Sequence, residues 1–365
     1  MNHRERVLAT LDHREPDRVP RYAGLDAEVI DEFRLKTGAD DPAEYWDWDI
    51  RSVGFMPPDP LPDLKARFER YLRHVEHEWL LDWEHRTYPP EWGVATRPAH
   101  MLSLAAPVSP MTTFTSVKEL EEYPFPDYLG EWRHDHLEAQ VKAIHAAGYP
   151  VAAHIGWIFQ TGWTLRSEVL LFTDFYENPE FADYLLQRIT EIRRGLAIRY
   201  AQAGVDMVHM NDDIGGQHSM ILSPRMWRQW LKPRLTDVVE AVHAVNPAIH
   251  FRYHSDGYYV PVIEDLIDLG VSCLVTLQPE ANDIYEIKKR FGDRVSLDGT
   301  IGLQSELRYG TPQDVRERVR QQCLGMMANG GWLASPGNGV TADIPFENLD
   351  AMFKALDEFG HYGAT

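Results

Sequence analysis

The chain has 365 residues, more than the roughly 250–300 at which a single hydrophobic core stops growing, so it forms two ordinary domains or one large barrel with insertions. Its 36 basic and 56 acidic side chains give a formal charge of −20, which excludes the basic surface that nucleic acids require. The two cysteines, Cys273 and Cys323, lie far apart and indicate no disulfide framework or thiolate cluster.

The N-terminal residues are charged and lack the apolar stretch of a signal peptide. No run approaches the ~20 apolar residues that cross a bilayer. We therefore expect a cytoplasmic protein with neither a membrane nor a nucleic-acid partner.

The first predicted element is a helix, in which Asn2 and Glu5 have the spacing of a capping box. A short strand over Arg18–Ala23 follows. Residues 38–130 are rich in Pro, Trp and Tyr, and we interpret them as an irregular insertion region within a single domain of residues 1–365. One further strand is expected within 79–105.

From about residue 133 onward, short β-rich runs alternate with amphipathic helical stretches, which is typical of βαβ units and a parallel sheet. No Gly-x-Gly-x-x-Gly sequence follows a strand, which argues against a dinucleotide-binding fold. Six runs and the two earlier strands make eight, so we predict a (β/α)₈ barrel with an N-terminal Pro/Trp-rich elaboration. The six runs are Val151–His154, Asp206–Met210, Ile249–Tyr253, Cys273–Leu277, Val295–Leu297 and Trp332–Ala334, and the helices between and after them cover 180–203, 224–244, 260–269, 312–328 and 346–359.

Polar residues follow each of these six strands. In a barrel the loops after the strands form the active site, so these residues should meet at one mouth. The segments concerned are His154, Asn211–Asp213, His254–Gly257, Gln278–Glu280, Asp298–Thr300 and Ser335–Gly339.

His254 and Asp256 form the sharpest local pattern, because His-x-Asp after a strand directs an imidazole and a carboxylate into one pocket. Such a pair binds a hard or borderline divalent metal, or acts as a base with its orienting carboxylate. The alternative is a loop anchor in which Asp256 caps the helix that begins near Val260.

Two further patterns also have a structural alternative. Asp212 and Asp213 are adjacent carboxylates, one of which can keep a raised pKa and serve as an acid; alternatively, one caps a helix and the other is solvated. Asn338 lies in the turn Ser335–Gly339, which either aims its side chain into the pocket or is only a tight turn.

Several segments together resemble the uroporphyrinogen decarboxylase superfamily. They are the opening RERVLATLDHREPDRVP, the glycine-containing stretch Ile155–Leu165, and Leu222–Trp227 with Pro233. The resemblance covers nearly the whole chain outside residues 38–130, and it implies a (β/α)₈ barrel.

Departures from the family patterns narrow the expected activity. True decarboxylases carry Arg-x-Ala-Gly-Arg near the N-terminus, whereas this chain has Leu25 in place of the second arginine. Asn338 stands where they have a histidine in a Gly-His-Gly turn. The resemblance therefore implies that uroporphyrinogen is not the substrate.

The corrinoid-linked methyltransferases of the superfamily hold zinc on His-x-Cys and a later cysteine. His254 matches that histidine, while Asp256 and Asn338 replace the two thiolates. The remaining nitrogen and oxygen donors suit a harder divalent metal, or no metal, and do not suit activation of a thiol.

The leading hypothesis is a methyltransferase-like enzyme that transfers a methyl or one-carbon group of a small oxygenated or aromatic compound, with cobalamin carried by a partner corrinoid protein. The alternatives are a decarboxylase of a small carboxylic acid, anchored by Arg21, and a non-catalytic barrel subunit. The expected catalytic residues are His254, Asp256, Asp213 and Asn338, with His254 and Asp256 as metal ligands, and the expected substrate-binding residues are Arg21, His154, Trp157, Trp163 and Gln278.

Overall fold

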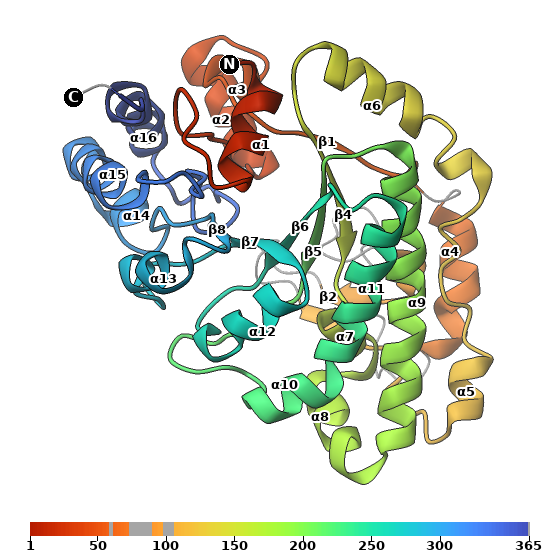
Figure 1. Cartoon of the computed structure of the whole chain (residues 1–365). Helices are drawn as coiled ribbons and strands as arrows, with labels where there is room; N and C mark the ends of the chain where they lie inside the picture. Colours follow the sequence, from red (N-terminus) through yellow and green to blue (C-terminus); the bar gives the residue numbers. More distant parts are fainter. Residues whose placement is uncertain (58–60, 73–89, 98–105, 364–365) are drawn as a thin grey trace.

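The computed structural model describes residues 1–57, 61–72, 90–97 and 106–363 (Figure 1). Its main sheet is parallel, with the strand order β1-β4-β5-β6-β7-β8, and β2 and β3 form a separate antiparallel pair. The strands are β1 (Arg51–Val53), β2 (Ala95–Arg97), β3 (Ala106–Val108), β4 (Val151–Gly156), β5 (Met207–Asn211), β6 (His250–His254), β7 (Val271–Val275) and β8 (Ser296–Leu297).

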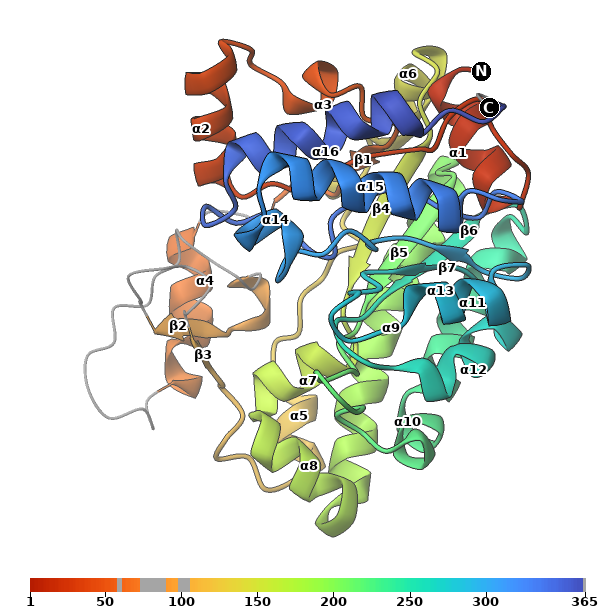
Figure 2. The same ribbon diagram turned by 90° about the vertical axis from the view of Figure 1, so that its left-hand side faces the viewer.

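Helices precede and follow the parallel strands as the sequence predicts. The α-helices are α1 (His3–Leu11), α2 (Ala27–Thr37), α3 (Pro42–Tyr45), α4 (Leu61–Phe68), α5 (Val117–Glu121), α6 (Leu137–Ala146), α7 (Phe159–Arg166), α8 (Glu168–Glu177), α9 (Pro179–Ala203), α10 (Pro224–Trp230), α11 (Lys232–Val245), α12 (Ile263–Asp268), α13 (Ile284–Phe291), α14 (Glu306–Tyr309), α15 (Pro312–Met326) and α16 (Phe346–Phe359). Short 3₁₀ turns lie at Glu69–Tyr71, Pro90–Trp92, Glu131–Arg133 and Val260–Val262. Figure 2 shows α15 and α16 packed side by side, with α2 next to α16.

Isolated parallel bridges close the six strands into a barrel. Leu297 pairs with Trp332, and Ile301 pairs with Pro336, which adds a segment beyond β8. This segment pairs in turn with the N-terminal segment through Arg21 and Ala334. The carbonyl of Arg21 then accepts a hydrogen bond of 2.9 Å from the amide of Asp49, just before β1. The predicted (β/α)₈ barrel is confirmed, with segments near residues 20 and 334 at its seam.

One barrel strand lies where the sequence did not suggest it. We expected a strand within 79–105, but residues 79–89 and 98–105 lie outside the described residues. The described part of that range contains β2, which pairs with β3 and not with the barrel. β1 completes the barrel instead, and its three residues are too few to show an alternating pattern.

The end of the barrel opposite the mouth is closed by α1. The Asn2 side chain accepts a hydrogen bond from the amide of Glu5, and the Glu5 carboxylate accepts one from the amide of Asn2, which fixes the start of the helix. Val7 and Leu11 of this helix pack in one apolar cluster with barrel residues, among them Met207 and Cys273. The part of the barrel interior next to α1 is therefore apolar and filled.

A buried ionic network surrounds this closed end. The Asp49 carboxylate is fully buried and accepts hydrogen bonds from the guanidinium groups of Arg6 and Arg18, at 2.7 Å each. Burial alone would raise the pKa of Asp49, but His3 and the two arginines keep it below its usual value.

No helix among the described residues is long and apolar enough to cross a membrane.

Candidate functional site

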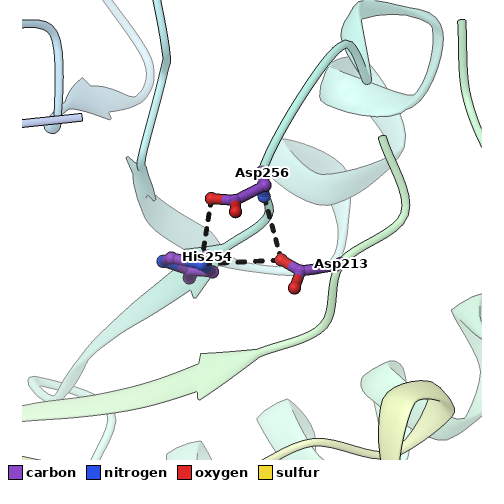
Figure 3. Close-up of side chains that lie close together, drawn as sticks. All are labelled: Asp213, His254 and Asp256. Atoms are coloured by element: carbon purple, nitrogen blue, oxygen red, sulfur yellow. Dashed lines mark hydrogen bonds and ion pairs between the residues drawn. The ribbon is translucent and has the colours of Figure 1, made fainter. Parts of the chain in front are cut away.

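The ends of β5 and β6 bring three titratable side chains together (Figure 3). Asn211 at the end of β5 pairs in register with His254 at the end of β6. Because parallel neighbours end at the same edge, the residues that follow them meet at the mouth. The Nε2 atom of His254 lies 3.5 Å from Oδ1 of Asp213 and 3.5 Å from Oδ1 of Asp256. One ligand atom from each residue lies within 4.8 Å of the others.

A contact with Thr276, on the side of the ring away from the two carboxylates, orients the imidazole of His254. The Thr276 hydroxyl lies 2.7 Å from its Nδ1 atom, which leaves Nε2 facing the two carboxylates. Thr276 follows β7 and has a φ of 64°, an unusual conformation for a β-branched residue. Such strained positions persist where the surrounding structure enforces them, and they cluster at functional sites.

Asp256 is held in place from both sides. Nδ2 of Asn338 donates to its two carboxylate oxygens at 3.0 and 2.8 Å, and the Asp256 amide donates to Oδ1 of Asp213 at 3.0 Å. The Gln278 side chain accepts a hydrogen bond of 2.8 Å from the amide of Gly257. Asn338 and Gln278 therefore position the loop that carries Asp256.

The two carboxyl groups of the cluster differ in acidity. Burial, followed by the negative charge of Asp213, raises the pKa of Asp256 to about 6. Burial acts in the same direction on Asp213, but its interaction with His254 outweighs this and lowers the pKa of Asp213. Two carboxylates that oppose each other's ionisation favour a bound proton or a bound cation between them.

The donor set suits a divalent cation. One neutral imidazole nitrogen and two carboxylate oxygens supply two negative charges, and metal-ligating histidines usually have their second nitrogen hydrogen-bonded, as Thr276 arranges here. The predicted ligands His254 and Asp256 lie together, and Asp213 could supply a third ligand atom. Nitrogen and oxygen donors of this kind suit Zn²⁺, Mn²⁺ or Fe²⁺.

The neighbouring Asp212 has a separate, structural role. Its side chain is 2% exposed, and it accepts hydrogen bonds of 3.0 Å from the amides of Phe159 and Gln160 at the start of α7. Burial raises its pKa to about 7 in spite of these two bonds. The adjacent carboxylates are thus divided between a helix cap and the cluster, which the sequence left open.

Inside the barrel, His154 lies next to a residue that the sequence analysis did not single out. The rings of His154 and His209 stack with their centroids 4.4 Å apart, and the ring of His209 lies 6.1 Å from that of His254. Arg252 beside them binds the buried carboxylate of Asp298, which also accepts a hydrogen bond of 2.7 Å from the Tyr22 hydroxyl. His209 lies two residues before Asn211 on β5, and side chains two residues apart share one face of a strand. This spacing from a predicted strand-end residue could have identified His209 from the sequence.

The three other predicted substrate-binding residues have different surroundings. The guanidinium of Arg21 is buried against Asp357 of α16, at 2.5 Å, and near Asp47. Trp163 packs edge-to-face on Phe159 with centroids 4.9 Å apart and lies partly buried against the hydrophobic core. Trp157 lines a small apolar pocket. The structure does not bring these three side chains into the cluster at His254.

Fold and site together define a (β/α)₈-barrel protein whose mouth gathers an imidazole and two carboxylates. Residues 97–359 match the uroporphyrinogen decarboxylase (URO-D) family, and the chain belongs to this family. It is 27% identical over 200 residues to the methylcobamide:CoM methyltransferase MtaA of Methanosarcina barkeri, covering 54% of this chain and 56% of that protein. It is 25% identical over 228 residues to the uroporphyrinogen decarboxylase of Coxiella burnetii, covering 61% and 59%.

The chain therefore spans between half and two thirds of the length of the curated relatives it matches. A solved methyltransferase from Methanosarcina mazei superposes with a TM-score of 0.62 at 18% identity, covering 98% of this chain and 99% of that one. This similarity shows that the barrel fold is shared over the whole chain. The curated relatives named here are enzymes of two types, a methyltransferase and a decarboxylase.

Proposed function

We propose that the chain is an enzyme that transfers a methyl or other one-carbon group between a small molecule and a corrinoid, which a partner protein carries. A divalent cation bound by Asp213, His254 and Asp256 would serve the transfer. The observation that carries this proposal is the convergence of these three side chains at the barrel mouth. The similarity to a methylcobamide-dependent relative supports the reaction class.

A cation in this position would act as a Lewis acid on a substrate oxygen and stabilise negative charge there. The chain's own residues do the positioning: Thr276 aims the imidazole, and Asn338 and Gln278 fix the loop of Asp256. When a methyl group leaves an oxygen, the electron pair of the broken C–O bond stays on that oxygen, which then needs a proton or a cation. Without a cation, the Asp256 carboxyl, with its raised pKa, would be the group that supplies the proton.

The donor set favours an oxygen compound over a thiol. Thiol activation relies on a soft metal site, and Asp256 and Asn338 occupy the positions where the resemblance places thiolates. Among the ligand candidates in the described residues there is no cysteine, since Cys273 and Cys323 are both buried elsewhere. We therefore propose an oxygenated or aromatic small molecule as methyl donor or acceptor.

The decarboxylase alternative needs a positively charged side chain that anchors the carboxylate of the substrate. Arg21, the residue expected to provide it, is bound by Asp357 and Asp47, so we do not propose this activity. The non-catalytic alternative differs from ours in one measurable respect, which is that it predicts no turnover by a metal-loaded protein.

The test is methyl transfer to free cobalamin as a stand-in for the partner-bound corrinoid. Purified protein loaded with Zn²⁺ or Mn²⁺ is mixed with reduced cob(I)alamin and a panel of methyl ethers and methanol, and methylcobalamin is followed by its absorbance. We expect turnover by the wild type and a loss of at least about 100-fold in Asp213→Asn and in His254→Ala. The control His243→Ala, on α11 outside the barrel, should keep the wild-type rate.

Two outcomes would contradict the proposal. Carbon dioxide release from small acids without cobalamin would indicate the decarboxylase. Absence of methyl transfer from every donor, with the metal bound, would favour the non-catalytic subunit.

A further inference from the structure

The middle of the barrel interior is lined by a layer of polar side chains. His154, His209 and Arg252 are register partners on β4, β5 and β6, so they share one level and one face of the sheet. Two residues earlier on their strands, Ala152 and Met207 face the apolar cluster with α1. Since side chains two residues apart point to the same face of a strand, the polar layer also faces the interior.

His209 is an unusual residue in this layer. It is 5% exposed, and neither of its ring nitrogens has a hydrogen-bond partner among the described residues. The Oδ1 atom of Asn211, two residues further along β5, is likewise buried and unpaired. Buried polar groups in folded proteins nearly always have partners, so an orphaned imidazole calls for a ligand.

The layer can be reached from the mouth. His154 is exposed, although Ala153 and Ile155 on either side of it are buried and it lies on an inward face of β4. The opposite end of the barrel is closed by Val7 and Leu11 of α1. Solvent therefore reaches His154 from the side of His254, and a substrate could follow the same path.

The charges around this layer are balanced within the protein. The guanidinium of Arg252 is bound by the Asp298 carboxylate and the Tyr22 hydroxyl. Solvent touches the ring of His154, but the ring lies deep inside the barrel, and this desolvation together with the charge of Arg252 lowers its pKa to about 4. Burial, with His154 and Arg252, also lowers the pKa of His209 well below its usual value. Among the described residues neither ring contacts a carboxylate that would stabilise its charged form, and the guanidinium of Arg252 lies beside them; each ring, as a neutral imidazole, offers one donor and one acceptor.

We propose that His154 and His209 form the floor of the substrate pocket and bind an uncharged oxygen group, a hydroxyl or an ether oxygen, of the small molecule. This inference rests on the proposed function for the reacting end of the substrate, which lies at Asp213, His254 and Asp256. A carboxylate is not matched at this floor, because the positive charge of Arg252 is already bound by Asp298. The substrate class is therefore a neutral compound that carries a second oxygen near the reacting one.

Three probes that differ in one group test this floor. 2-Methoxyphenol carries a neutral hydroxyl beside its methyl ether, anisole lacks that hydroxyl, and 2-methoxybenzoate replaces it with a carboxylate. Their dissociation constants are measured by ligand-observed NMR on the whole 365-residue chain, with and without Zn²⁺. We expect the wild type to bind 2-methoxyphenol at least about tenfold more tightly than either analogue.

Replacement of the His209 ring by a similar ring without nitrogens should remove this preference. In His209→Phe we expect the three probes to bind within about twofold of one another, with unchanged zinc content and an equal or higher melting temperature, because no orphaned nitrogen remains. In His209→Asn, which keeps one donor and one acceptor, part of the preference should return. The control His243→Phe on α11 should behave as the wild type.

Two results would overturn the proposal. One is a wild type that shows no preference for 2-methoxyphenol. The other is a His209→Phe variant that keeps the preference and melts at a lower temperature, as a packing residue would. A protein that binds no Zn²⁺ but still prefers 2-methoxyphenol would refute the cation of the proposed function and leave the floor intact.

Discussion

Asp256→Asn should stabilise the metal-free protein while removing its cation site. The substitution keeps the shape of the side chain and at least one hydrogen bond to Asn338. It removes one of two carboxylates whose Oδ1 atoms both lie 3.5 Å from the same imidazole nitrogen of His254. The repulsion from Asp213 then disappears, together with the charge that a cation needs.

The magnitude follows from the pKa of Asp256. A rise from 3.8 to about 6 would correspond to about 3 kcal/mol for a fully buried group. The side chain is 34% exposed, and solvent screening reduces this to about 1 kcal/mol. A carboxyl group with a raised folded-state pKa holds its proton more tightly in the native state, so the native state loses stability as the pH rises from about 4 through about 6. The variant lacks this loss.

The assay is urea denaturation with EDTA at pH 8 and at pH 4.5, followed by the same measurement with Zn²⁺ at pH 8. We expect the variant to be about 1 kcal/mol more stable than the wild type at pH 8 in EDTA, and the two to converge at pH 4.5. Excess Zn²⁺, at about 100 times its dissociation constant, should add about 2.7 kcal/mol to the wild type only. A variant that is less stable than the wild type at pH 8 in EDTA would refute the reasoning and make Asp256 a structural anchor.

Three further predictions concern two substitutions and one assay of the unchanged protein. Asp212→Ala should lower the free energy of unfolding by about 1–2 kcal/mol in urea denaturation, because two amides of α7 lose their acceptor. Asp49→Ala should cost about 3–5 kcal/mol in the same assay by leaving buried guanidinium groups unpaired, and a cost below about 1 kcal/mol would contradict the ionic network. Purified protein should not convert uroporphyrinogen to coproporphyrinogen in a chromatographic assay, because Leu25 and Asn338 replace the arginine and histidine of true decarboxylases.

The barrel could be predicted because apolar residues recur with different periods in strands and in helices, and because polar residues accumulate where the strands end. The same logic predicted that His254, Asp256 and Asn338 lie close together, and in the structure Asp256 contacts both of the others. β1 could not be predicted, since three residues in a Pro- and Trp-rich region carry no periodic signal. Its place in the barrel depends on pairing with β4, which is distant in sequence.

The direction in which an individual side chain points was harder to predict from the sequence. Arg21 and Tyr22 are adjacent, and alternation along the segment sends the arginine outward to Asp357 and the tyrosine inward to Asp298. Nothing in the local sequence tells which of the two faces inward. Asp212 and Asp213 present the same difficulty, because their division depends on where α7 begins in space.

The most direct test of a cation centre at the barrel mouth is the metal content of the purified protein, measured by inductively coupled plasma mass spectrometry after incubation with Zn²⁺ or Mn²⁺ and desalting. We predict about one equivalent per chain in the wild type, and less than about a tenth of an equivalent in His254→Ala and Asp213→Asn. The melting temperature of metal-free His254→Ala should fall by only a few degrees, because the exchange removes one hydrogen bond to Thr276. A wild type without metal, or variants that retain it in full, would contradict the centre formed by Asp213, His254 and Asp256.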